Sequence, residues 1–261
     1  MATVSDDGAV PRRQRAVQRG LTRLLVRDMQ KLRALIVPSR LQQTIPAWIA
    51  AMDALIRQYG ETSASLAADF FDAQRDAAGV PGSFTVPLPD APPPEQVEAS
   101  LRWASKDVWP RDEARATQVQ LRPVDERVAA AQAKAEEVAQ KLVADQGRET
   151  VRQAVRADRQ AVGYARAAAL GACAFCRLMA SRGMVYASAG TAGQDANDRF
   201  LGDGTAKYHN SCSCCVVPVF RGQRFELSAH AAEWDRLYRE YAAPFPGDQL
   251  RRFRQAIAEH G

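Results

Sequence analysis

Histidine is scarce in this chain, and long apolar runs are absent. The 261 residues include three histidines, His209, His230 and His260. No window approaches the roughly 18 to 20 consecutive apolar residues needed to cross a bilayer, so we expect no membrane-spanning segment. No Walker loop follows a predicted strand, and the glycine spacings do not match a dinucleotide-binding fingerprint. These absences argue against a membrane-spanning protein, a P-loop enzyme and a dinucleotide-binding domain.

The shortage of histidine also argues against hydrolytic catalysis. A serine protease needs a histidine base beside its nucleophile and an acid that orients the base. The imidazole nearest to the candidate hydroxyls of Ser181, Ser188 and Ser211 is His209, which belongs to a cysteine cluster. A catalytic zinc would need an open coordination position beside a base, whereas Asp203 in Gly-Asp-Gly is typical of a turn. We therefore expect no catalytic residues, and an enzyme is the less favoured interpretation.

Cysteine is missing from the first 172 residues and then occurs five times in a short stretch. The arrangement is Cys173-x-x-Cys176 followed by His209-x-x-Cys212-x-Cys214-Cys215. Two thiol clusters with one imidazole have the spacing of metal ligands, and thiolate with imidazole favours zinc. A redox dithiol and buried apolar cysteines are the alternatives. The odd cysteine count, the charged first stretch and the lack of a signal peptide argue for a reducing compartment and against disulfides.

The strand pattern separates the last cysteines. In an extended segment Cys212 and Cys214 share a face, whereas Cys215 points the other way into the apolar run that it begins. We expect a closed structural zinc site, and which four residues bind the ion stays open. Its binding energy would supply much of the folding energy of this glycine-rich segment. The candidate ligands are Cys173, Cys176, His209, Cys212 and Cys214.

Positive charge gathers near both ends of a chain whose net charge is +5. These ends could contact phosphate or an acidic protein surface, although a solvated helix face explains the pattern equally well. No aromatic residues are interleaved to stack on bases. The candidate nucleic-acid contacts are Arg12, Arg13, Arg15 and Arg19, and a second basic group comprises Arg251, Arg252 and Arg254.

Apolar periodicity predicts a mainly α-helical protein. After a loose terminus over 1–9, helices are expected over 11–38, 45–59, 62–78, 95–109 and 124–170, and Gly60 and Gly147 are expected to end or kink them. A proline- and glycine-rich linker over 79–94 separates the third helix from the fourth. The long alanine-rich helix carries a thin seam that fits packing within a bundle. It is expected to lead directly into Cys173, before short strands near 184–186 and 215–220 and closing helices over 226–243 and 247–260.

These elements suggest four regions along the chain. Residues 1–94 form an N-terminal helical region with its linker, and 95–170 a central helical region. Residues 171–225 form a small α+β module stapled by zinc, and 226–261 the C-terminal helices.

The cysteine segment also carries a family resemblance. The run ACAFCRLMASRG over 172–183, followed by Val185-Tyr186, YHNSCSC over 208–214 and VVPVF over 216–220, resembles the Mu F-like minor head proteins of tailed bacteriophages. The actinobacteriophage branch is the most similar, and stretches at 66–71 and 94–104 share the resemblance. Cys215 departs from the pattern, because a small polar residue is expected there.

The resemblance implies a structural minor capsid protein in the capsid interior near the portal, made in the host cytoplasm. Its implied role is head morphogenesis, with effects on DNA packaging or ejection. The implied partners are the portal protein, the major capsid protein and packaged DNA bound without sequence preference. The alternatives are a capsid maturation protease or other zinc-dependent enzyme, and a zinc-stabilised DNA-binding protein.

Overall fold

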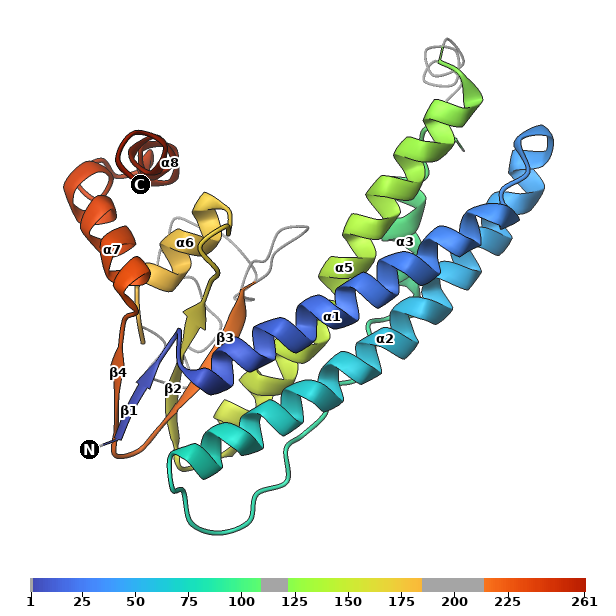
Figure 1. Ribbon diagram of the computed structural model, residues 1–261. Coiled ribbons are helices and arrows are strands. Elements are labelled where there is room, and N and C mark those ends of the chain that lie inside the picture. Colours follow the sequence, from blue (N-terminus) through green and yellow to red (C-terminus); the bar gives the residue numbers. More distant parts are fainter. Residues whose placement is uncertain (1, 109–121, 185–213) are drawn as a thin grey trace.

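The computed structural model describes residues 2–108, 122–184 and 214–261. It is mainly helical, as predicted, with two small sheets. Figure 1 shows a long helical arm that diverges from a smaller part built of strands and short helices. None of the described helices combines the length and apolarity needed to cross a membrane.

Four helices build the arm: α1 (Ala9–Lys31), α2 (Leu41–Ala77), α3 (Pro94–Ala104) and α5 (Val124–Ala157). Two 3-10 turns, η1 (Leu32–Leu35) and η2 (Pro38–Arg40), connect α1 to α2. The predicted stripe on α2 is buried, with Trp48 and Met52 fully enclosed. The thin seam of α5 packs into the same core, through Val128, Ala131, Ala135, Val138 and Leu142. Both patterns therefore face the interior of the bundle, as predicted.

Gly60 and Gly147 are packing positions and not helix ends. α2 continues through Gly60 and α5 through Gly147, so the predicted break at Gly60 and the predicted kink or break at Gly147 are wrong. A Cβ atom on Gly147 would lie 2.7 Å from Ser63 Oγ and 3.0 Å from the Ser63 carbonyl oxygen. Glycine is required there because the backbones of α2 and α5 approach too closely for any side chain.

The predicted linker after α2 is confirmed as non-helical, and it is pinned to the base of the arm. Phe84 contacts Phe71 at 5.6 Å between ring centroids, and the Arg75 guanidinium lies 5.3 Å from the Phe84 ring. Arg75 Nε also donates to Asp158 Oδ2 at 3.0 Å in a buried ion pair. The linker therefore covers a charged contact between the ends of α2 and α5.

The alanine-rich stretch does not stay helical to residue 170. α5 ends at Ala157, and residues 161–167 form β2 (Ala161–Ala167), antiparallel to β3 (Cys215–Phe220). Asp158 leaves the helix with extended backbone, and its Oδ1 accepts from the Gln160 backbone N–H. Alanine is a strong helix former, so the prediction failed where tertiary pairing with β3 overrides propensity.

The first residues are also ordered, against the prediction of a loose terminus. β1 (Ala2–Ser5) pairs in parallel with β4 (Gln223–Glu226), with Ala2 opposite Gln223 and Ser5 opposite Glu226. Val4 is buried in a second core that joins the base of the arm to β2 and β3. Long-range pairing of this kind leaves no local signal in a four-residue segment.

Three short helices complete the fold: α6 (Ala174–Ser181), α7 (Ala229–Tyr241) and α8 (Gln249–His260). They surround a third core that includes Trp234, Leu237 and Phe253. Both predicted closing helices are confirmed. From here on, the module means this part of the molecule, residues 168–184 with 214–260, and no longer the range 171–225 expected from the sequence.

Candidate metal centre

The first thiol pair lies at the start of α6. Cys173 is the N-cap residue with extended backbone, and its Sγ accepts from the Cys176 backbone N–H at 3.4 Å. Cys173 is exposed, whereas Cys176 is 1% exposed and turns into the third core. A backbone N–H that points at sulfur stabilises negative charge on that sulfur, which suits a metal-bound thiolate.

The second thiol segment returns to the same place through strand pairing. Ala167 at the end of β2 lies opposite Cys215 at the start of β3, so the chain leaves for Cys173 beside the point where Cys214 enters. Cys214 is 4% exposed and belongs to the same core as Cys176. Its carbonyl oxygen accepts from Arg148 Nε at 3.1 Å, which fixes the start of β3 against α5.

Cys215 faces the opposite side of the strand, as the alternation of an extended segment predicts. It packs against the second core, with Phe220 and Tyr164, and not the third. Burial raises the pKa of the Cys215 thiol to about 11, although Arg15 and Arg148 nearby act in the other direction. The Cys215 side chain lies on the face of β3 that points away from Cys176 and Cys214, which supports leaving Cys215 out of the candidate ligands.

The described residues do not by themselves complete a metal site. Among residues 2–108, 122–184 and 214–261, no group of three or more His, Cys, Asp or Glu side chains is placed to hold an ion. His209 and Cys212 lie outside the described residues. Zinc therefore stays a prediction, to which the structure adds one matching observation: Cys176 and Cys214, from the two halves of the motif, enter one core.

The candidate catalytic hydroxyl within the described part is used locally. Ser181 is buried, and its hydroxyl donates to the Leu178 carbonyl oxygen at 2.9 Å. Ser188, Ser211 and Asp203 lie outside the described residues. A cavity of about 30 Å³ lies between α1, α5 and the start of β3, which is room for about one water molecule and not for a peptide.

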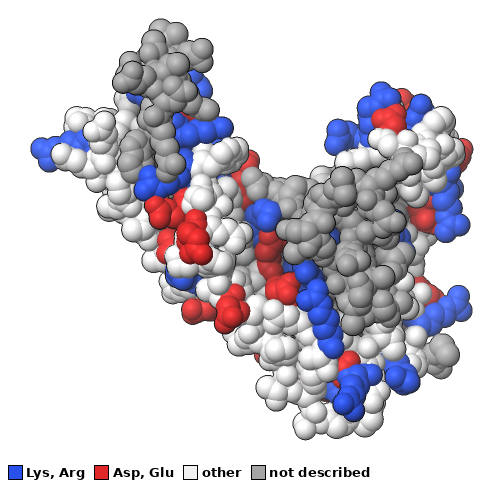
Figure 2. All heavy atoms as spheres, turned by 180° about the vertical axis from the view of Figure 1, so that it is seen from behind, with Lys and Arg blue, Asp and Glu red and all other residues white. Residues whose placement is uncertain are grey.

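The basic residues of α1 divide into two kinds. Arg13 and Arg19 are exposed, and the Arg12 side chain is 59% exposed with Asp7 Oδ2 at 3.5 Å. Arg15 is buried instead, and it donates to the Asp6 carbonyl oxygen at 2.6 Å and to Asp7 Oδ1 at 2.7 Å. Its guanidinium is therefore committed within the fold. Figure 2 shows basic side chains interspersed with acidic ones over the described atoms of the rear face, and no continuous basic stripe there.

Comparison with known families decides the relationship. A model of the VG15 protein family matches residues 7–242, which span both thiol segments and the helices of the arm. The chain belongs to the VG15 family. The family is of the viral gene product 15 type, which indicates a phage protein. No curated protein and no solved structure matches the chain significantly.

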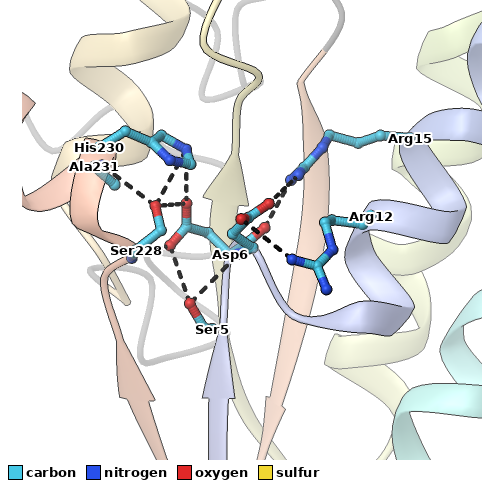
Figure 3. Close-up of polar contacts among 8 residues, drawn as sticks. Ser5, Asp6, Arg12, Arg15, Ser228, His230 and Ala231 are labelled. Atoms are coloured by element: carbon cyan, nitrogen blue, oxygen red, sulfur yellow. Dashed lines mark hydrogen bonds and ion pairs between the residues drawn. The ribbon is translucent and has the colours of Figure 1, made fainter.

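One polar cluster of this VG15 chain was missed by sequence reasoning. Asp6, Ser228 and His230 meet between the end of β1 and the start of α7 (Figure 3). The Ser228 hydroxyl donates to Asp6 Oδ2 at 2.8 Å, and Ser228 Oγ lies 3.1 Å from His230 Nε2. Ser228 is the N-cap of α7, and its Oγ accepts from the Ala231 backbone N–H. A serine before a helix is a capping signal, but nothing local pointed to Asp6 as its partner.

These three residue types form a catalytic triad elsewhere, but their geometry here differs. In a triad the histidine lies between the other two, with one ring nitrogen toward serine and the other toward the acid. Here Asp6 Oδ2 lies 3.7 Å from His230 Nε2, the same nitrogen that faces Ser228. The serine hydroxyl bonds the carboxylate directly. The arrangement therefore caps a helix and binds a carboxylate.

Proposed function

We propose that this phage protein is a structural, non-enzymatic minor component of the head that acts near the portal. The observation that carries the proposal is the convergence of Cys176 and Cys214 in one core at the base of a long helical arm. The family match over residues 7–242 supports it, because it covers both of these parts. The role in head morphogenesis itself comes from the resemblance to Mu F-like minor head proteins.

In this proposal the module is a rigid base and the arm is the reaching element. Zinc, bound by residues drawn from Cys173, Cys176, His209, Cys212 and Cys214, would hold the module together and take part in no reaction. Leu35 and Val37 are exposed where α1 turns into α2, and the turn lies far from the module (Figure 1). Exposed apolar side chains at such a tip suit contact with another protein of the particle.

Contact with packaged DNA is the second part of the proposal. Arg12, Arg13 and Arg19 are available on the surface of α1, whereas Arg15 is not. Binding through three exposed arginines would be weak, independent of sequence and strongly reduced by salt.

The test is the location of the protein in purified particles. Mass spectrometry of mature particles, portal complexes and empty capsids should find it in few copies and together with the portal. Crosslinks to the portal should start from the arm. Absence from purified particles would contradict the proposal.

Co-expression with the major capsid protein separates this proposal from an enzyme. The structural function predicts an uncleaved capsid protein. Cleavage that is lost on replacing Ser181 or Asp203 would instead support a maturation protease.

A further inference from the structure

Residues 2–7 contact the module in the way that a bound extended peptide contacts its receptor. The backbone of β1 pairs with β4 along four residues. On this strand Val4 is buried in the second core, whereas Ala2 and Thr3 are exposed. A main-chain ladder with a pocket for one alternate side chain is the pattern of β-strand addition.

The segment ends in a carboxylate that is held from several sides. Asp6 is 0% exposed, and Oδ1 accepts from the Ser228 backbone N–H at 2.6 Å. Oδ2 accepts from the Ser228 hydroxyl, and the carbonyl oxygen accepts from Arg15 Nη1. His230 Nε2 lies 3.7 Å from Oδ2. The N-terminus of α7, a helix of 13 residues, adds its positive dipole.

The receptor side comes from parts of the chain that are distant in sequence. Asp6 and Ser228 are separated by 222 positions, and Arg15 reaches the same residue from α1. The link between segment and arm is short: Gly8 N–H donates to the Ser5 carbonyl oxygen at 3.2 Å, and α1 begins at Ala9. Residues 2–7 therefore make all of these contacts: the main-chain pairing with β4, the burial of Val4 and the hydrogen bonds of Asp6. The turn at Gly8 separates them from α1.

We propose that the groove formed by β4, Ser228, His230 and Arg15 is a docking site for an extended peptide with an apolar residue two positions before an aspartate. Its occupant is the chain's own segment 2–7, which binds the module through β4 and Ser228 and the arm through Arg15. Asp6 determines specificity, because the groove offers donors at both carboxylate oxygens. Asparagine keeps the shape of aspartate but replaces one acceptor with a donor and removes the charge. The inference does not depend on a location in the head.

The experiment uses the full chain with a cleavable flexible loop inserted between Gly8 and Ala9. After cleavage of the folded protein, native mass spectrometry measures retention of the freed segment, and a labelled synthetic peptide of residues 2–8 measures rebinding. We expect retention, and at least about tenfold weaker rebinding for Asp6→Asn, as for loss of a buried charged partner. Thr3→Ala is the matched control and should bind like the unchanged peptide, because Thr3 is exposed.

Equal rebinding of the Asp6→Asn and unchanged peptides would overturn the proposal. A dimeric intact chain whose segment occupies the groove of a second copy would overturn the assignment of the occupant. If the loop insertion prevents folding, amide hydrogen exchange of uncut Asp6→Asn decides the question. The proposal predicts faster exchange over 223–241 with α2 unchanged, and uniform exchange across both regions contradicts it.

Discussion

The arm and the module are stabilised in different ways. The arm buries a continuous apolar core that includes Trp48, Met52 and Leu101. The module has short helices, a core that includes Cys176 and Cys214, and polar contacts to distant segments, such as Arg148 to Cys214 and Asp6 to Ser228. The arm is held by the hydrophobic effect along its own helices, whereas the module combines a smaller apolar core with specific polar contacts made across the chain.

The difference teaches where each region is vulnerable. Removing one apolar contact from the arm leaves many other contacts in place, so the arm loses only part of its stability. The module has a smaller core, so each specific polar contact makes up a larger share of its stability.

Metal removal should give the largest effect and separate the two regions most clearly. A chelator should open the module, with faster amide exchange over α6, β3 and α7, while α2 stays protected. Structural zinc contributes on the order of 10 kcal/mol in small domains. Elemental analysis should find about one zinc per chain, a number that follows from one four-ligand site.

The matched variants are Cys176→Ser and Cys215→Ser. The first should lose zinc, and the second should keep it, because Cys215 packs against the other core. Unchanged exchange after chelation, or a zinc-free protein, would disprove the metal site.

Trp48→Ala should destabilise the arm by about 3–5 kcal/mol, because a fully buried large side chain leaves a cavity. The denaturation midpoint of the helical signal would report this loss. Leu24→Ala is the control, since Leu24 is 45% exposed and should change stability by well under 1 kcal/mol. Similar losses in both variants would mean that this core does not stabilise the arm.

Gly147→Ala should cost about 1–3 kcal/mol, because the new methyl group would collide with Ser63 and push α2 from α5. Gly20→Ala is the opposite case: nothing lies within 4 Å of the added Cβ, and α1 should gain about 0.5–1 kcal/mol. Thermal unfolding of the two variants should therefore shift in opposite directions. A shift in the same direction would contradict the close approach at Gly147.

The Cys215 thiol should give the smallest effect, and only in alkali. Its folded pKa of about 11 lies above the ordinary value of 9.0, so the folded state holds this proton more tightly. The contribution is fully present below about pH 9 and is lost as pH rises through 11. Two pKa units set an upper limit of about 3 kcal/mol, and the partial exposure of Cys215 lowers the effect below that limit. Cys215→Ala should flatten the stability curve between these values. An unchanged slope would place the titration elsewhere.

Periodicity was enough to predict the arm. The stripe from Ile45 to Ile56 and the alternating seam of α5 each bury what their spacing indicates. The same reasoning misread Gly60 and Gly147, because a glycine that ends a helix and one that admits a neighbouring helix look alike in a single sequence. Only the approach of Ser63 distinguishes them.

The module was predicted less well, because its contacts are distant in the chain. The thiol spacing drew attention to Cys173, Cys176 and Cys214, of which the structure brings Cys176 and Cys214 into one core, while the metal site itself stays a prediction. Strand alternation separated Cys215 from them. The strand at 161–167 was read as helix because alanine dominates it, and its partner lies about 50 residues later. Asp6 could not be singled out from the sequence, because its structural role depends on hydrogen bonds with Ser228 and Arg15, which are distant along the chain.

The parallel pairing of β1 with β4 has a consequence for biosynthesis. The first six residues leave the ribosome long before their binding groove exists, since Ser228 follows Asp6 by 222 positions. At translation rates of about 5–20 residues per second, the nascent chain carries this end unpaired for roughly 10–45 s. Closure of the β1–β4 pair is therefore a late event relative to the synthesis of α1 and α2, because it can occur only after residue 226 has been translated.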